Sequence, residues 1–83
     1  MKVQVRYFAS VREALGKGSE SLETGAATLG ALRDELVARG GSYAVALARG
    51  KAVRMALDQE MCDEAAALAE GAEVAFFPPV TGG

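Results

Sequence analysis

The chain has 83 residues and carries a strand-like segment at each of its two ends. Near the start, Val3, Val5 and Tyr7 recur with the period of two that is typical of a β-strand. Residues 73–77 form a second such segment, which must end at Pro78-Pro79 because proline has no backbone N–H to donate to a sheet. A chain this short forms one domain, so we expect both strands to enter the same sheet.

One helix is predicted clearly between these two ends. Thr28 is placed to cap its first turn, and its leucines recur at the spacing of a single helical face: Leu29, Leu32 and Leu36. The charged residues of the segment are expected on the opposite side of the helix: Arg33, Asp34, Glu35 and Arg39. Gly40-Gly41 ends the helix, and residues 43–48 are expected to add another helical turn.

The remaining segments predict further strands and two short helical pieces. The strands are expected at residues 18–24, 53–57 and 61–62, with a turn at Asp58-Gln59 between the last two. Ser10 and Glu13 form a capping box that is expected to open a short helix, and Gly16 ends that helix. Residues 65–70 are expected to form a small α-helical or 3₁₀ segment.

This order of elements predicts an α+β fold in which a mixed sheet packs on one main helix, the two-layer arrangement open to so small a chain. Parallel pairing of the first and last strands at the centre of the sheet gives the β-grasp arrangement, as in ubiquitin. We therefore expect a ubiquitin-like β-grasp domain over residues 1–77, followed by an extended C-terminal tail over residues 78–83.

The composition removes several kinds of chemistry. There is no histidine, the usual general base and the commonest metal ligand. The single cysteine, Cys62, stands beside Asp63 and Glu64, whose charges raise a thiol pKa, so we expect a structural thiol that relays no sulfur. The net charge of −2 argues against nucleic acid as a partner, and no apolar stretch approaches a membrane span. We expect a cytoplasmic protein without a metal site, a nucleic-acid partner or a membrane partner.

The tail is suited to entering the site of a partner protein. Pro78-Pro79 favours an extended backbone, and six residues reach roughly 20 Å at full extension. Gly82-Gly83 removes the side chains from the end, so the backbone can pass a narrow channel. The chemical group delivered is the Gly83 carboxylate, which ATP would activate as an acyl-adenylate and sulfide or a persulfide would convert to a thiocarboxylate. An idle, frayed terminus is the alternative interpretation.

The last strand also predicts an exposed aromatic side chain. Successive strand residues face opposite sides of a sheet, so Phe76 is expected beneath the helix and Phe77 on the outer face. There Phe77 is expected to form an apolar patch with Phe8 and Met61. Contiguous exposed apolar surface usually marks a binding site.

Both ends of the chain resemble the small subunit of molybdopterin synthase. The motifs that carry the resemblance are YFASVREALG at residues 7–16 and EVAFFPPVTGG at residues 73–83. The resemblance implies a sulfur carrier that binds no cofactor and catalyses nothing alone. A ubiquitin-activating-type adenylyltransferase would use ATP to adenylate the terminal glycine, and a sulfur donor would follow. The tail would then enter the large subunit of a heterotetramer, where sulfur passes to cyclic pyranopterin monophosphate.

The resemblance also implies roles for individual residues. Gly83 would be adenylated and thiocarboxylated, with Gly82 and Thr81 giving the tail clearance. The residues implied in partner binding are Phe77, Pro78, Pro79, Val80, Phe8 and Met61. The chain departs from the family at Asp58, where Asn is common, and at residues 67–74, which usually read Pro-Leu-x-Asp-Gly-Asp-Glu-Val. These departures affect local turns and surface fit, and they leave the tail motif intact.

Two other kinds of function fit the same sequence. A sulfur carrier for thiamin or tRNA thiolation, or a ubiquitin-like modifier, needs the same tail, so Gly82-Gly83 does not separate these from the molybdopterin pathway. The Phe-Phe-Pro-Pro lead-in and the motif at residues 7–16 favour the molybdopterin carrier. A non-catalytic β-grasp interaction domain with an idle tail would instead bind partners through its apolar patch alone.

Overall fold

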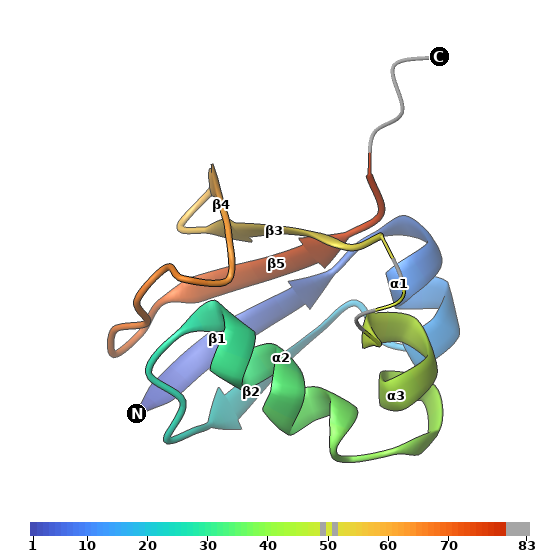
Figure 1. Cartoon of the computed structure of the whole chain (residues 1–83), viewed down its shortest axis with the longest axis horizontal. Helices are drawn as coiled ribbons and strands as arrows, with labels where there is room; N and C mark the ends of the chain where they lie inside the picture. The colour runs from blue at the N-terminus through green and yellow to red at the C-terminus, as the bar shows by residue number, and fades with distance from the viewer. Residues whose placement is uncertain (49, 51, 80–83) are drawn as a thin grey trace.

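The structure is a computed structural model that describes residues 1–48, 50 and 52–79. Its elements in chain order are β1 (Lys2–Tyr7), α1 (Ala9–Leu15), β2 (Ser19–Glu23), α2 (Leu29–Val37), α3 (Gly41–Leu47), β3 (Arg54–Leu57), β4 (Glu60–Cys62) and β5 (Glu73–Phe77). Figure 1 shows β1 and β5 side by side in the middle of the sheet. In the described part of the chain, no helix has the length and apolar character needed to cross a membrane.

The strands form one mixed sheet in the order β2-β1-β5-β3-β4. β1 and β5 pair in parallel, with Val5 opposite Val74 and Tyr7 opposite Phe76. The other neighbouring strands pair antiparallel. The predicted α+β fold is therefore confirmed, including the central parallel pairing of the two end strands.

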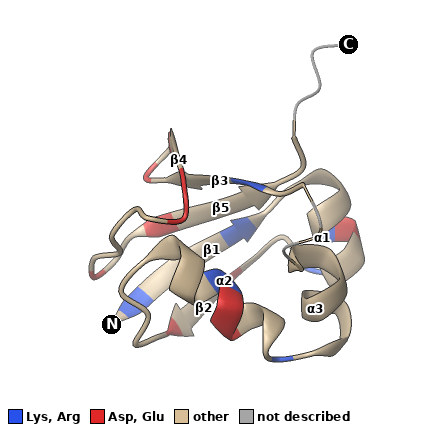
Figure 2. Cartoon of the chain, in the orientation of Figure 1, with Lys and Arg blue, Asp and Glu red and all other residues tan. Residues whose placement is uncertain are grey.

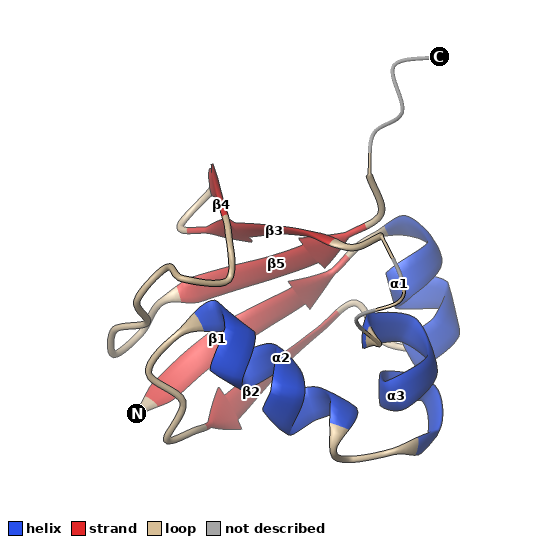
Figure 3. Cartoon of the chain, in the orientation of Figure 1, coloured by secondary structure: helices blue, strands red, loops and turns tan. Residues whose placement is uncertain are grey.

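Helix α2 supplies much of the core, as predicted. The Thr28 Oγ1 accepts a hydrogen bond from the Ala31 N–H at 3.2 Å, so the predicted cap is confirmed. The side chains of Leu29, Leu32 and Leu36 are fully buried against the sheet. Figure 3 shows α1 and α3 together at one end of the sheet, beside the point where β1 and β5 end. The helical turn predicted at residues 43–48 is the longer helix α3.

The prediction that Arg33 lies on the exposed side of α2 is wrong. Its side chain is buried, and its Nε and one Nη donate to the backbone oxygens of Leu47 and Ala48 at 2.7 and 2.8 Å. The other Nη lies 3.5 Å from a carboxylate oxygen of Glu64. These partners compensate the buried positive charge of Arg33. The two hydrogen bonds from Arg33 therefore hold the end of α3 against α2.

Two local predictions about short helices are also wrong. The first helix begins at Ala9 with Phe8 as its N-cap, without a side-chain cap, so Ser10 lies within the first turn and makes no capping box with Glu13. Its predicted end is confirmed, since Gly16 caps it with a φ of 75°. Residues 65–70 form no helix, because their backbone groups pair with the segment before and at the start of α2.

A charged cluster ties α3 to the edge of the sheet. The Glu20 carboxylate accepts hydrogen bonds from the hydroxyls of Tyr7 and Tyr43 at 2.8 and 2.6 Å. Lys17 and Arg39 lie within 3.7 and 3.3 Å of its other oxygen. Burial alone would raise the pKa of Glu20, but the hydrogen bonds from Tyr43 and Tyr7 and the charge of Lys17 outweigh it and lower this pKa. Glu20 is thus ionised at neutral pH.

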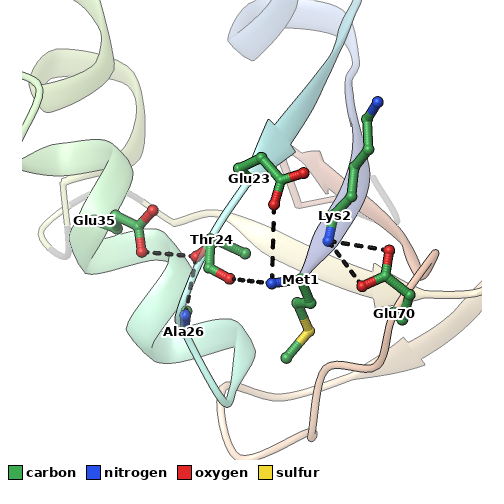
Figure 4. A network of polar contacts seen from close by, with 7 residues as sticks. All are labelled: Met1, Lys2, Glu23, Thr24, Ala26, Glu35 and Glu70. Atoms are coloured by element: carbon green, nitrogen blue, oxygen red, sulfur yellow. Dashed lines mark hydrogen bonds and ion pairs between the residues drawn. The ribbon is translucent and has the colours of Figure 1, made fainter.

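A second polar network fixes the start of β1 (Figure 4). The Met1 ammonium donates to the Thr24 backbone oxygen at 2.9 Å, and the Thr24 hydroxyl donates to Glu35 of α2 at 2.7 Å. The Lys2 backbone N–H donates to the Glu70 carboxylate at 3.2 and 3.3 Å. Met1 is therefore bound to Thr24, just after β2, Thr24 is in turn bound to α2, and Lys2 is bound to the loop before β5.

Gly30 in α2 offers a test of how tightly α2 packs on the loop after β4. A Cβ at Gly30 would lie 3.0 Å from the Cβ and 3.2 Å from the backbone oxygen of Glu64. Replacing a helical glycine by alanine normally stabilises a helix by about 1 kcal/mol. We expect Gly30→Ala to lower the free energy of unfolding by about 1 kcal/mol instead, because neither Glu64 atom can move freely. Urea denaturation followed by circular dichroism measures this change.

The matched control is Gly25→Ala, because a Cβ there meets no atom within 4 Å. Its effect should stay within about 0.5 kcal/mol. Equal effects of the two substitutions would contradict the proposed contact between α2 and Glu64.

Candidate functional site

The candidate site lies where β5 ends and the C-terminal segment begins. Val74 and Phe76 are fully buried on the helix side of the sheet, and Phe77 faces the other side and is half-buried. The Phe8 N–H donates to the Phe76 backbone oxygen at 3.1 Å, just beyond the end of β1. Pro78 follows, and the regular strand stops at Phe77 as predicted. The chain therefore leaves the sheet from its centre, beside the start of α1.

Phe8 and Phe77 form an aromatic pair at this point. Their ring centroids lie 6.5 Å apart at an interplanar angle of 83°, an edge-to-face contact. Phe8 is 41% exposed although it is apolar. It lies one residue past the end of β1, because it is the N-cap of α1. The outer-face position predicted for Phe77 is confirmed by the register, which sets Phe77 opposite exposed Arg54 of β3, but the predicted exposure is wrong, because the Phe77 side chain is half-buried.

Met61 lies on the same face, but farther away than predicted. It pairs with Ala56 of β3, and Ala56 in turn pairs with Ala75 of β5. Met61 is 61% exposed on the edge strand β4. Half-buried Ala75 and buried Ala56 therefore lie between the aromatic pair and Met61, and Met61 does not cluster with Phe77 as expected. We call Phe8, Phe77, Ala75, Ala56 and Met61 the outer-face patch.

Sequence reasoning missed two arginines on this face. Arg6 pairs with Ala75, and Arg54 pairs with Phe77, so the two side chains stand on either side of β5. Both are exposed. The strand periodicity contained the signal, because Arg6 shares its strand face with Phe8, two residues away.

A shallow hollow adjoins the root of the tail on the helix side. Its volume is about 190 Å³, and its lining comes from α1, α3, the segment before β3 and the first tail residue: Ser10, Val11, Ala14, Val45, Ala46, Ala52, Val53 and Pro78. No sequence pattern predicted this hollow, because it depends on the packing of α1 against α3. Pro78 therefore begins the C-terminal tail and also lines this hollow at the helical end of the domain.

The tail beyond Pro79 lies outside the described residues. The predicted roles of Val80, Thr81, Gly82 and Gly83 therefore stay predictions, as do those of Pro78, Pro79 and the other partner-binding residues. The domain boundary at residue 77 stays a prediction too, although β5 ends there.

Side chains that could perform chemistry are scarce around the site. Burial, and then the charge of Asp63, raises the pKa of the Cys62 thiol, so the thiol is a weak nucleophile at neutral pH. Its Sγ lies 3.9 Å from the backbone oxygen of Met55. Within residues 1–48, 50 and 52–79, no three His, Cys, Asp or Glu side chains are grouped so that they would hold a metal ion.

The mixed sheet with its central parallel pair and the helix packed across it define a ubiquitin-like β-grasp protein, the class that the sequence predicted. Comparisons with known proteins agree. The sequence model of the ThiS family matches residues 5–83. The chain therefore belongs to the ThiS family.

Relatives cover nearly the whole chain. The "Molybdopterin synthase sulfur carrier subunit" of Haemophilus influenzae is 41% identical, over 98% of this chain and 99% of that protein. Among solved structures, H. volcanii small archaeal modifier protein 1 is 26% identical with a TM-score of 0.75, over 95% of this chain and 98% of that chain. The complex of subunits 1 and 2 of the molybdopterin-converting factor from Helicobacter pylori contains a chain 25% identical, with a TM-score of 0.70 and full coverage of both chains.

The two neighbouring phenylalanines of β5 test the assignment of the sheet faces. We expect Phe76→Ala to lower the free energy of unfolding by about 4 kcal/mol, because the ring is fully buried in the core. Phe77→Ala is the matched control and should cost about 1 kcal/mol, since its ring is half-buried on the outer face. Urea denaturation of both variants measures the two costs. The reverse order would mean that the faces of β5 are exchanged.

Proposed function

We propose that this protein is the sulfur-carrier subunit of a molybdopterin synthase in molybdenum cofactor biosynthesis. The observation that carries the proposal is the similarity, over almost the whole length of both proteins, to the sulfur carrier subunit of H. influenzae. The fold supports it, because β5 leads directly from the core into the Pro-Pro and Gly-Gly tail. The protein acts as a carrier and is not an enzyme on its own.

The tail carboxylate is activated by a separate, ubiquitin-activating-type adenylyltransferase. The Gly83 carboxylate is ionised at neutral pH and is a poor electrophile. An oxygen of the carboxylate attacks the α-phosphorus of ATP, pyrophosphate leaves, and an acyl-adenylate results. A sulfur donor at the oxidation level of sulfide then attacks the acyl carbon, and AMP leaves. The product is a Gly83 thiocarboxylate, and ATP binds to the activating enzyme rather than to this chain.

The thiocarboxylate is used in the large subunit of the synthase, within a heterotetramer. Its sulfur bonds to a carbon of cyclic pyranopterin monophosphate as an oxygen substituent leaves that carbon, and water then cleaves the acyl carbon–sulfur bond, so that the sulfur stays on the substrate. That cleavage restores the Gly83 carboxylate for another cycle. The complex of subunits 1 and 2 of the similar H. pylori factor supports a large-subunit partner for this chain.

The geometry around β5 fits this use of the tail. The six residues from Pro78 onward reach roughly 20 Å, so the reacting carbon can lie well inside a partner. The aromatic pair Phe8 and Phe77 stands at the root of the tail and gives the partner an apolar contact that fixes where the tail enters. Thr81 and Gly82 then give the clearance that a narrow passage demands. We place these reactions in the cytoplasm.

A second function, that of a protein modifier, is supported by the similarity to H. volcanii small archaeal modifier protein 1. The activation of Gly83 would be the same, but an amine would attack the adenylate or thioester and form an amide. A carrier for thiamin or tRNA thiolation also shares the activation. The acceptor of the acyl group or sulfur therefore distinguishes these functions.

The tail mechanism predicts a sharp loss of function without unfolding. We expect Gly82→Ile, and separately one alanine added after Gly83, to abolish molybdopterin formation. The first blocks the narrow passage, and the second displaces the reacting carboxylate. The assay combines the carrier with its large subunit, the adenylyltransferase, ATP, sulfide and cyclic pyranopterin monophosphate. Gly25→Ala, remote from the tail, is the control and should retain full activity. Full activity of either tail variant would refute the mechanism, and an unchanged thermal midpoint shows that the fold is intact.

A further inference from the structure

The outer-face patch is bordered by two exposed arginines that the proposed chemistry does not use. Figure 2 shows a basic segment near the end of β1 and another at the start of β3, on either side of β5. They are Arg6, opposite Ala75, and Arg54, opposite Phe77. The chain as a whole carries a net charge of −2, so this positive border differs in sign from the rest of the molecule.

Arg6 is held against the aromatic pair. Its guanidinium carbon lies 5.5 Å from the centre of the Phe8 ring, a cation–π distance. One Nη lies 3.5 Å from a carboxylate oxygen of Glu73, whose charge partly offsets that of Arg6. The Arg6 side chain nevertheless remains 52% exposed. Arg6 therefore has a defined position beside Phe8, and the nearby Glu73 carboxylate weakens the attraction of Arg6 for other negative charges.

Arg54 is the less compensated of the two charges. It is exposed at the start of β3, and within the described part of the chain no ion pair involves it. Asp63 directly follows β4, whose residue Cys62 pairs with Met55, and the Asp63 carboxylate accepts a hydrogen bond from the Ala65 N–H at 2.8 Å. Arg54 thus presents a full positive charge beside Phe77.

We propose that Arg6 and Arg54 form a cationic border that steers this carrier onto its large subunit, where carboxylates flank an apolar site for Phe8 and Phe77. This inference rests on the proposed function and names the chemistry of the partner surface. The position of the two positive charges carries it: an apolar patch alone gives no long-range attraction, whereas two positive charges beside it attract a surface of opposite sign. Such charges at the border of an interface act mainly on the association rate and on orientation.

The experiment compares charge reversals at two places on the same sheet face. Arg54→Glu alters the border, and Lys2→Glu is the control, because Lys2 is an exposed residue at the other end of β1. Both substitutions change the net charge by the same amount. Stopped-flow association with the large subunit from the same organism is measured for both variants and the wild type at low and high salt. Arg6→Glu is measured in parallel.

We expect Arg54→Glu to slow association about tenfold at low salt and the difference to shrink at high salt, because added ions screen the attraction. Arg6→Glu should have a smaller effect, since Glu73 already offsets Arg6. Lys2→Glu should stay within about twofold of wild type, as expected for a charge away from the interface. Circular dichroism confirms that all variants are folded.

The outcomes separate the two claims. If the wild type binds the large subunit but Arg54→Glu and Lys2→Glu associate equally fast, the arginine border is refuted and the proposed function stands. A loss for Arg54→Glu that is unaffected by salt also refutes the border, because it indicates a short-range contact. If the wild type does not bind the large subunit at all, both the proposed function and the border are refuted.

Discussion

The parallel pairing of β1 with β5 is the constraint on which the rest of the structure depends. It joins the two ends of the chain at the centre of the sheet, with Val5 against Val74 and Tyr7 against Phe76. Because both strands run in the same direction, they end at the same edge of the sheet, and Phe8 there donates a hydrogen bond to the Phe76 oxygen. The aromatic pair and the origin of the tail are therefore products of one strand pairing.

The helical layer keeps that edge rigid. α2 covers the inner face of the sheet with its leucines, and buried Arg33 holds the final carbonyls of α3. The ionised Glu20 binds Tyr43 of α3 and Tyr7 of β1 together. These contacts fix α3 beside α1 and shape the hollow that Pro78 borders. A tail that must deliver its last atom into a partner benefits from a rigid point of departure.

Most features set by local sequence were predictable, the capping box expected at Ser10 and Glu13 being an exception, whereas several features set by distant contacts were not. The strand alternation around Val3 and the cap at Thr28 act within a few residues, so both predictions are confirmed. Arg33 was assigned to the wrong side of its helix because its partners, Leu47, Ala48 and Glu64, are distant in sequence. Residues 65–70 look helical by composition, yet their backbone pairs with residues 27–29.

The same division holds at the site. Phe77 could be placed on the outer face because alternation within one strand is local. The separation of Met61 from Phe77 depends on the order of three strands in the sheet. Residue spacing within one strand does not predict that order. The arginine border needed both the alternation and the strand order. The tail motif itself was visible in the sequence, because its chemistry lies in the terminal carboxylate and needs no fold to be recognised.

The central claim is that Gly83 becomes a thiocarboxylate, and intact-mass analysis tests it most directly. The full chain is incubated with ATP, sulfide and the adenylyltransferase of the same organism, and the C-terminal peptide is then examined. We predict a mass increase equal to the replacement of one oxygen by sulfur, located on the peptide that ends in Gly83. An unchanged mass, with an enzyme shown to be active on another carrier, would contradict the account and leave an interaction domain with an idle tail.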